Sequence, residues 1–199
     1  MKVRHFSFLL VLIFAAASLA SCGGGGGAPG SDDTNKTEVL IQSVLISAES
    51  DDIDVVSLRL LCDGEDEEPL TDANATMEIS ATTINQNPAF LSPFPANIEQ
   101  CFISYTSAVI GAPIIESKTV YPNCSFIDGT TSCTVELLNI ARKDQWWDDV
   151  TSGKFTPENG PPTTYTVSYS CRYQNSFGKT GQLGGRMDID LSNWLSCGG

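Results

Sequence analysis

Apolar and polar residues alternate with a period of two along most of the chain after residue 38. Successive side chains of a β-strand point to opposite faces, so this pattern predicts strands that each bury one face. The first two strands are expected at 38–48 and 55–62. Later segments with the same alternation are 76–81, 101–106, 133–137, 165–173 and 187–191.

About eight strands of this kind in roughly 160 residues predict an all-β fold, built as an antiparallel β-sandwich. One short helix is expected at 139–149, where the sequence reads Asn-Ile-Ala-Arg-Lys-Asp-Gln-Trp-Trp-Asp-Asp. The glycines within 181–185 lie between two predicted strands, and we expect them to form a turn.

The N-terminus has the three parts of an export signal: Lys2 and Arg4, an apolar stretch at 6–17, and small residues that lead to Cys22. The stretch is shorter than the roughly 20 residues that cross a bilayer, so a retained membrane helix is not expected. Leu-Ala-Ser-Cys at 19–22 resembles the lipobox of bacterial lipoprotein signal peptides. The resemblance implies cleavage before Cys22, acylation of this cysteine and, with glycine at the next position, sorting to the outer membrane. The alternative is an ordinary secretory signal.

Five glycines follow Cys22, and then Ala-Pro-Gly-Ser-Asp-Asp-Thr-Asn, so nothing apolar is available for burial. This composition predicts a flexible tether. Its fourteen residues, 23–36, give a root-mean-square reach of about 20 Å. The expected organisation is a signal peptide at 1–21, a lipidated cysteine with its tether at 22–37, and one sandwich domain at 38–199.

The chain has seven cysteines. Besides Cys22 there are six: Cys62, Cys101, Cys124, Cys133, Cys171 and Cys197. An even number in an exported chain predicts three disulfides. Asp-Gly at 128–129 is a strong hairpin signal, and a two-residue loop there would place Cys124 opposite Cys133, about 4.5 Å apart at Cα, within disulfide range. The other four cysteines allow three connectivities.

Residues 169–178 read Tyr-Ser-Cys-Arg-Tyr-Gln-Asn-Ser-Phe-Gly. This segment resembles the Tyr-x-Cys-x-x-x-Asn-x-x-Gly signature on the penultimate strand of immunoglobulin domains. The resemblance implies an immunoglobulin-like or fibronectin-like sandwich, in which the Tyr169 hydroxyl bonds backbone near the strand entry. It also implies that Cys171 bridges the two sheets to Cys101, and Cys62 would then pair with Cys197. It implies nothing about a ligand.

The only histidine, His5, lies in the signal segment, so the mature chain has none. This excludes Ser-His-Asp and Cys-His catalysis and histidine-ligated zinc. The sequence has no phosphate-binding glycine loop with lysine and no dinucleotide fingerprint. We therefore expect no cofactor and no enzymatic activity. A hydrolase that uses a carboxylate pair stays open, since acidic residues are numerous.

Removal of the signal peptide leaves 9 basic against 24 acidic residues, a net charge of −15. Such a surface repels nucleic acid and bare anionic headgroups. Two acidic clusters could supply the six to eight oxygens that calcium prefers, although solvated loops have the same composition. The candidate ligands are Asp51, Asp52, Asp54, Asp63, Glu65 and Asp66.

Trp146 and Trp147 are adjacent on the predicted helix. Adjacent helical residues point about 100° apart, so only one of them can face the core squarely. The other could contact a sugar or a protein partner. We therefore expect a membrane-anchored envelope lipoprotein with a non-enzymatic sandwich, which binds or scaffolds another envelope protein or a saccharide. The alternative is a calcium-dependent saccharide-binding module, and the third possibility is the carboxylate-based hydrolase.

Overall fold

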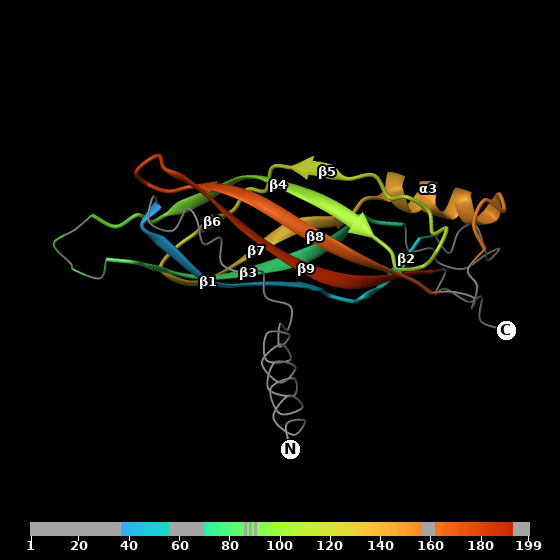
Figure 1. Ribbon diagram of the computed structural model, residues 1–199, viewed down its shortest axis with the longest axis horizontal. Coiled ribbons are helices and arrows are strands. Elements are labelled where there is room, and N and C mark those ends of the chain that lie inside the picture. The colour runs from blue at the N-terminus through green and yellow to red at the C-terminus, as the bar shows by residue number, and fades with distance from the viewer. Residues whose placement is uncertain are drawn as a thin grey trace, which may run out of the picture.

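A computed structural model describes residues 37–55, 70–85, 87, 89, 91–156 and 162–192. Within them the chain forms nine strands and the helix α3 (Figure 1). The elements are β1 (Val39–Ala48), β2 (Asp52–Asp54), β3 (Ala73–Thr83), β4 (Ala96–Thr106), β5 (Lys118–Val120), β6 (Ser125–Phe126), β7 (Gly129–Leu138), α3 (Ile140–Thr151), β8 (Thr163–Gln174) and β9 (Thr180–Ser192). No helix of this described part is long and apolar enough to cross a membrane.

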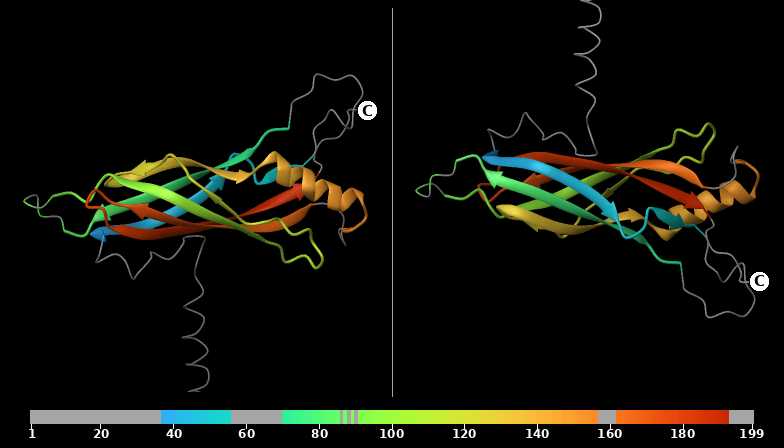
Figure 2. Two further views of the ribbon diagram at one scale, coloured as in Figure 1. Left: turned by 90° about the horizontal axis from the view of Figure 1, so that it is seen from above. Right: turned by 90° about the horizontal axis from the view of Figure 1, so that it is seen from below.

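The strands form two sheets. One has three strands in the order β1-β3-β7, and the other has six, in the order β2-β9-β8-β4-β5 with β6 also paired to β4. Figure 2 shows that the strands of both sheets run along the length of an elongated body. The all-β prediction, with two sheets and a helix after β7, is thus confirmed.

The core lies between the sheets and consists of the residues that the alternation placed inward. On β8, for example, every second side chain from Tyr165 to Tyr173 is buried, and on β3 the same holds from Ala75 to Ala81. The sheets come closest where β9 crosses β1. A Cβ added at Gly185 would lie 2.7 Å from Cγ1 of Ile46, so a larger residue has no room there.

The expected turn at 181–185 is therefore wrong, because these glycines lie inside the long strand β9. Glycine is needed at these positions because other groups approach the backbone too closely to leave room for a side chain. At Gly181 an added Cβ would lie 2.5 Å from the Tyr173 ring, which packs over the strand.

A short strand that the sequence pattern did not predict, β2, lies just before the predicted second strand. It pairs in parallel with the end of β9, with Asp52 opposite Asp190 and Ile53 opposite Leu191. Ile53 and Val55 are buried, so the apolar positions of this acidic segment determine its place in the sheet. Residues 56–62 of the predicted strand lie outside the described residues.

Two of the expected disulfides are present, Cys101–Cys171 and Cys124–Cys133. Cys62 and Cys197, the expected third pair, lie outside the described residues. Cys101 and Cys171 are directly opposite each other on β4 and β8, with Cα atoms 4.0 Å apart, so this bridge lies within one sheet. The immunoglobulin-like bridge between sheets is therefore wrong for this pair.

Cys124–Cys133 takes the inter-sheet position instead. Cys124 directly precedes β6, which pairs with β4, whereas Cys133 lies on β7, which pairs with β3. The expected hairpin is therefore wrong, although the expected bridge is right. The turn at Asp128 and Gly129, where Gly129 has φ 106°, passes the chain from one sheet to the other.

The sandwich has two distinct ends. The helix end contains α3 and the β4–β5 loop (107–117), and it lies on the right in Figure 1. The tether end contains the start of β1 and the connections after β3, β6 and β8.

Candidate interaction surface at the helix end

The β4–β5 loop presents two apolar side chains to solvent. Ile110 is 90% exposed and Ile114 is 83% exposed. Scattered apolar residues are normal on protein surfaces, but a pair of them at the tip of one ordered loop is a candidate contact site. The loop reads Ser-Ala-Val-Ile-Gly-Ala-Pro-Ile-Ile-Glu-Ser from 107 to 117.

Hydrogen bonds hold the two arms of this loop. The Ser107 hydroxyl donates to the Thr164 carbonyl at 2.7 Å and accepts the Val109 N–H at 3.1 Å. On the other arm, the Tyr165 hydroxyl donates to the Pro113 carbonyl at 2.8 Å. A turn between the arms places Gly111 at φ 78°. Ile110 and Ile114 are therefore displayed on a preformed backbone, which lowers the entropy cost of binding.

Trp146 supports this loop from beneath. It is 2% exposed, and its indole Nε1–H donates to the Tyr165 hydroxyl at 2.9 Å, which in turn donates to Pro113. Burial raises the pKa of Tyr165 to about 12, so the hydroxyl stays protonated as a donor near neutral pH. Trp146 thus positions the loop and is not itself available for contact.

Trp147 is partly buried and packs against the core. The prediction that only one of the two tryptophans faces the core squarely is confirmed. Of the two candidate contact residues, only Trp147 presents surface to a partner.

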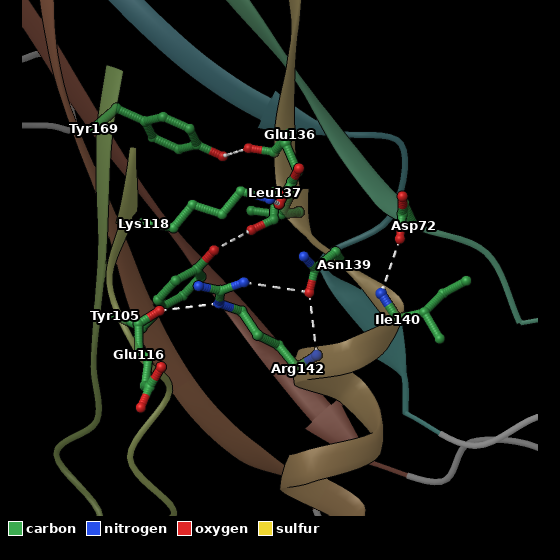
Figure 3. A network of polar contacts seen from close by, with 10 residues as sticks. All are labelled: Asp72, Tyr105, Glu116, Lys118, Glu136, Leu137, Asn139, Ile140, Arg142 and Tyr169. Atoms are coloured by element: carbon green, nitrogen blue, oxygen red, sulfur yellow. Dashed lines mark hydrogen bonds and ion pairs between the residues drawn. The ribbon is translucent and has the colours of Figure 1, made fainter. Parts of the chain in front are cut away.

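Two side chains cap the N-terminus of α3 (Figure 3). The Asn139 carboxamide accepts the Arg142 N–H at 3.1 Å, and the Asp72 carboxylate accepts the Ile140 N–H at 2.8 Å. The first N–H groups of a helix have no partner inside it, so these caps stabilise its start. The predicted beginning of the helix at Asn139 agrees with this geometry.

Arg142 joins the helix to the β4–β5 loop. Its Nε–H donates to the Glu116 carbonyl at 3.0 Å, and one terminal nitrogen, Nη1, donates to Asn139 at 3.4 Å (Figure 3). The loop is therefore held by β8 on one side and by α3 on the other.

Two buried tyrosines brace the sheets behind the loop (Figure 3). Tyr105 on β4 donates to the Leu137 carbonyl at 2.6 Å, and Tyr169 on β8 donates to the Glu136 carbonyl at 3.0 Å. Both acceptors lie on β7 of the other sheet. The expected bond of Tyr169 near its own strand entry is therefore replaced by one across the sandwich. Burial raises the pKa of both hydroxyls, that of Tyr105 to about 12.

Lys118 and Glu136 form an ion pair between β5 and β7. It closes the edge of the sandwich beside the two tyrosine bonds (Figure 3).

The described part of the acidic region does not form a metal site. Among the residues that the structure describes, no three His, Cys, Asp or Glu side chains gather as metal ligands would. Asp54 instead lies near Lys143, whose ammonium donates to the Thr71 carbonyl at 2.9 Å. Burial lowers the pKa of Lys143, and the charges of Asp54 and Asp72 oppose this shift.

Other predicted site residues are not placed. Cys22, Asp63, Glu65 and Asp66 lie outside the described residues. Asp51 and Asp52 are exposed at the start of β2, where the Asp51 carbonyl accepts the Asp190 N–H at 2.8 Å.

Neither Ile110 nor Ile114 is among the site residues predicted from the sequence. A usable signal exists, because Val-Ile-Gly-Ala-Pro-Ile-Ile at 109–115 is an apolar run in which Gly and Pro break any strand. In such a run some apolar side chains stay exposed, although Ile115 is buried in the core.

No protein-family model and no curated protein matches the chain. One solved structure with some similarity is described as "X-ray structure of Northeast Structural Genomics Consortium target SoR45". The identity is 11%, the match covers 81% of this chain and 93% of that chain, and the TM-score is 0.28.

Proposed function

We propose that this protein is a lipid-anchored lipoprotein of the bacterial envelope, and that its sandwich presents a non-enzymatic protein-binding surface at the helix end. It would then serve as an accessory component of an envelope complex. The observation that carries the proposal is the braced β4–β5 loop, which displays Ile110 and Ile114 to solvent.

The position of the loop fits an anchored binding protein. The tether joins the domain at residue 37, and β1 runs from there towards the helix end. Ten residues of strand span about 33 Å. The loop is therefore held at the end of the domain far from the point of attachment. A partner can reach it there.

The charges around the loop indicate the chemistry of the partner. Acidic residues at the helix end are Asp51, Asp52, Asp54, Asp72, Glu116, Asp144, Asp148 and Asp149, against the basic residues Arg142, Lys143 and Lys154. Two exposed isoleucines at an end with this excess of negative charge are complementary to an apolar pocket beside Lys and Arg. We therefore expect a protein partner with a basic rim, and binding that weakens as salt is added.

The alternative, calcium-dependent binding of a saccharide, stays a prediction. It relies on acids of which half lie outside the described residues, and on two tryptophans of which Trp146 is buried. The described residues therefore favour a protein contact through the isoleucines.

A site-specific photo-cross-linking experiment tests the proposal in the cells that make the protein. A photoreactive phenylalanine derivative replaces Ile110 in one variant, Ile114 in a second and the exposed Leu45 on β1 in a control. We expect the first two variants to capture the same protein in near-stoichiometric amount and the control to capture none of it. Capture that is equal at Leu45, or absent at both loop positions, would reject the binding surface.

A second step separates the surface from the fold. Ile110→Ser combined with Ile114→Ser should abolish co-purification of the captured protein, whereas Leu45→Ser should retain it. Circular dichroism should be unchanged in both, because all three side chains are exposed.

A further inference from the structure

We infer that the tether end is a second contact surface, and that its apolar loop tips rest in the headgroup region of the bilayer to which the chain is anchored. This inference rests on the proposed lipidation of Cys22. Its occupant is the lipid bilayer, and its central residues are Leu91, Ile127 and Phe177.

The topology brings exposed apolar side chains from three connections to this end. Leu91 in the β3–β4 connection is 82% exposed, Ile127 between β6 and β7 is 56% exposed, and Phe177 between β8 and β9 is also exposed. Ile84, at the end of β3, adds a fourth. The described parts of the β3–β4 connection project beyond the strands on the left of Figure 1.

Hydrogen bonds within the domain join these loop tips to each other before they contact lipid. The Ser176 N–H donates to the Pro93 carbonyl at 2.9 Å, and its hydroxyl donates to the Ser92 carbonyl at 2.8 Å. These bonds tie the loop that carries Leu91 to the turn that carries Phe177. The Asn175 carboxamide holds that turn, because it accepts the Phe177 N–H at 3.0 Å.

The tether leaves the domain at the same end. The Asn175 side-chain N–H donates to the Thr37 carbonyl at 2.6 Å, and the Thr37 hydroxyl bonds the Tyr173 hydroxyl at 3.1 Å. Lys179 pairs with Glu38 at 3.6 Å. Thr37, where the tether meets the domain, is therefore held by the turn that carries Phe177.

The length of the tether favours contact at this end. Its fourteen residues have a root-mean-square reach of about 20 Å, which is less than the length of β1. On average the tether end is thus within reach of the bilayer, while the helix end points away from it.

The charge distribution also favours membrane contact at the tether end. In a chain of net charge −13, the twenty residues 79–98 contain no charged residue at all. The helix end, in contrast, carries the acidic residues named above. The rest of the tether end carries Asp128 and the Lys179–Glu38 pair, so its charges nearly balance. Negative charge is repelled by anionic lipids, so this end is the part that can approach the membrane. Apolar side chains at its surface gain free energy as they become buried among the lipids.

Depth-dependent quenching of tryptophan in the complete lipidated protein tests this inference. The protein is reconstituted in vesicles of phosphatidylcholine and phosphatidylethanolamine, with and without brominated acyl chains. Leu91→Trp and Ile127→Trp report on the tether end, and Ile110→Trp is the matched control at the helix end. Emission of the unsubstituted protein, which has three tryptophans, is subtracted.

We expect Leu91→Trp and Ile127→Trp to be blue-shifted and quenched several-fold more by the brominated lipid than Ile110→Trp. Flotation with the vesicles separately reports the lipid anchor. Protein that floats but shows equal quenching at both ends would overturn the bilayer contact and leave the anchor intact. A blue shift without quenching would instead place the tip against a second copy of the chain. Failure to float would refute the lipidation and the inference with it.

Discussion

Cys124 and Cys133 are nine residues apart in the chain, yet their disulfide joins the two sheets of the sandwich. Cys101 and Cys171 are 70 residues apart, and their disulfide joins neighbouring strands of one sheet. The shorter bridge therefore fixes how the sheets sit on each other, and the longer bridge fixes the pairing of two central strands.

The two bridges should differ in their contribution to stability. In the chain-entropy model a closed loop of about 10 residues contributes about 3 kcal/mol and one of about 70 residues contributes about 4 kcal/mol. Replacement of both cysteines of a pair by alanine should lower the free energy of unfolding by about these amounts. Urea unfolding of the two double variants measures this. A larger loss for Cys124/Cys133 would show that the contact between the sheets outweighs loop entropy.

The faces of the strands could be predicted from sequence, but their neighbours could not. Which side chains point inward is a local property with a period of two, and it needs only the residues of one strand. Pairing depends on competition between distant segments. The Asp128-Gly129 turn allows a hairpin, but β7 gains nine paired positions with β3, whereas β6 offers only two residues.

In the candidate site, too, some features follow from local sequence and others depend on distant residues. The helix and its cap at Asn139 follow from local sequence, and the structure has both. The loop of Ile110 and Ile114 is significant only because Tyr165 and Arg142, from other elements, hold it in place. Those contacts join residues 26 or more positions apart, and no local pattern contains them.

Cys22→Ser tests the lipid anchor. The variant lacks the thiol that is expected to receive the lipid, so it should lose its acyl chains and remain uncleaved or become soluble. Mass spectrometry of the mature N-terminus and detergent-phase partitioning measure the change. Alanine at the neighbouring Ser21 is the matched control and should still be lipidated. Unchanged acylation of the Cys22→Ser variant would refute the lipobox assignment.

The buried tyrosines should make the protein sensitive to alkali. Burial raises the pKa of Tyr105 and of Tyr165 from 10.0 to about 12 in the folded state. At a pH between about 10 and 12, these two hydroxyls are deprotonated in the unfolded chain but still protonated in the folded protein. The stability is therefore fully present below pH 10 and declines as the pH rises from about 10 to 12.

Melting temperatures between pH 8 and pH 12 check this, together with the absorbance of tyrosinate. Tyr105→Phe removes one of the buried tyrosine hydroxyls, so its melting temperature should fall less steeply with pH than that of the parent protein. Slopes that are identical in the two proteins would mean that Tyr105 titrates alike in the folded and unfolded states.

Trp146 and Trp147 provide a matched pair for the support of the binding loop. Trp146→Phe removes the N–H that donates to Tyr165, and leaves a partly unfilled space in the core. The free energy of unfolding should fall by about 2 kcal/mol, and amide exchange in the β4–β5 loop should accelerate. Trp147→Phe changes a partly exposed ring and should cost about 0.5 kcal/mol, with loop exchange unchanged. If both variants accelerate exchange in the loop equally, Trp146 does not act through Tyr165, and the loop must owe its order to Ser107 and Arg142 alone.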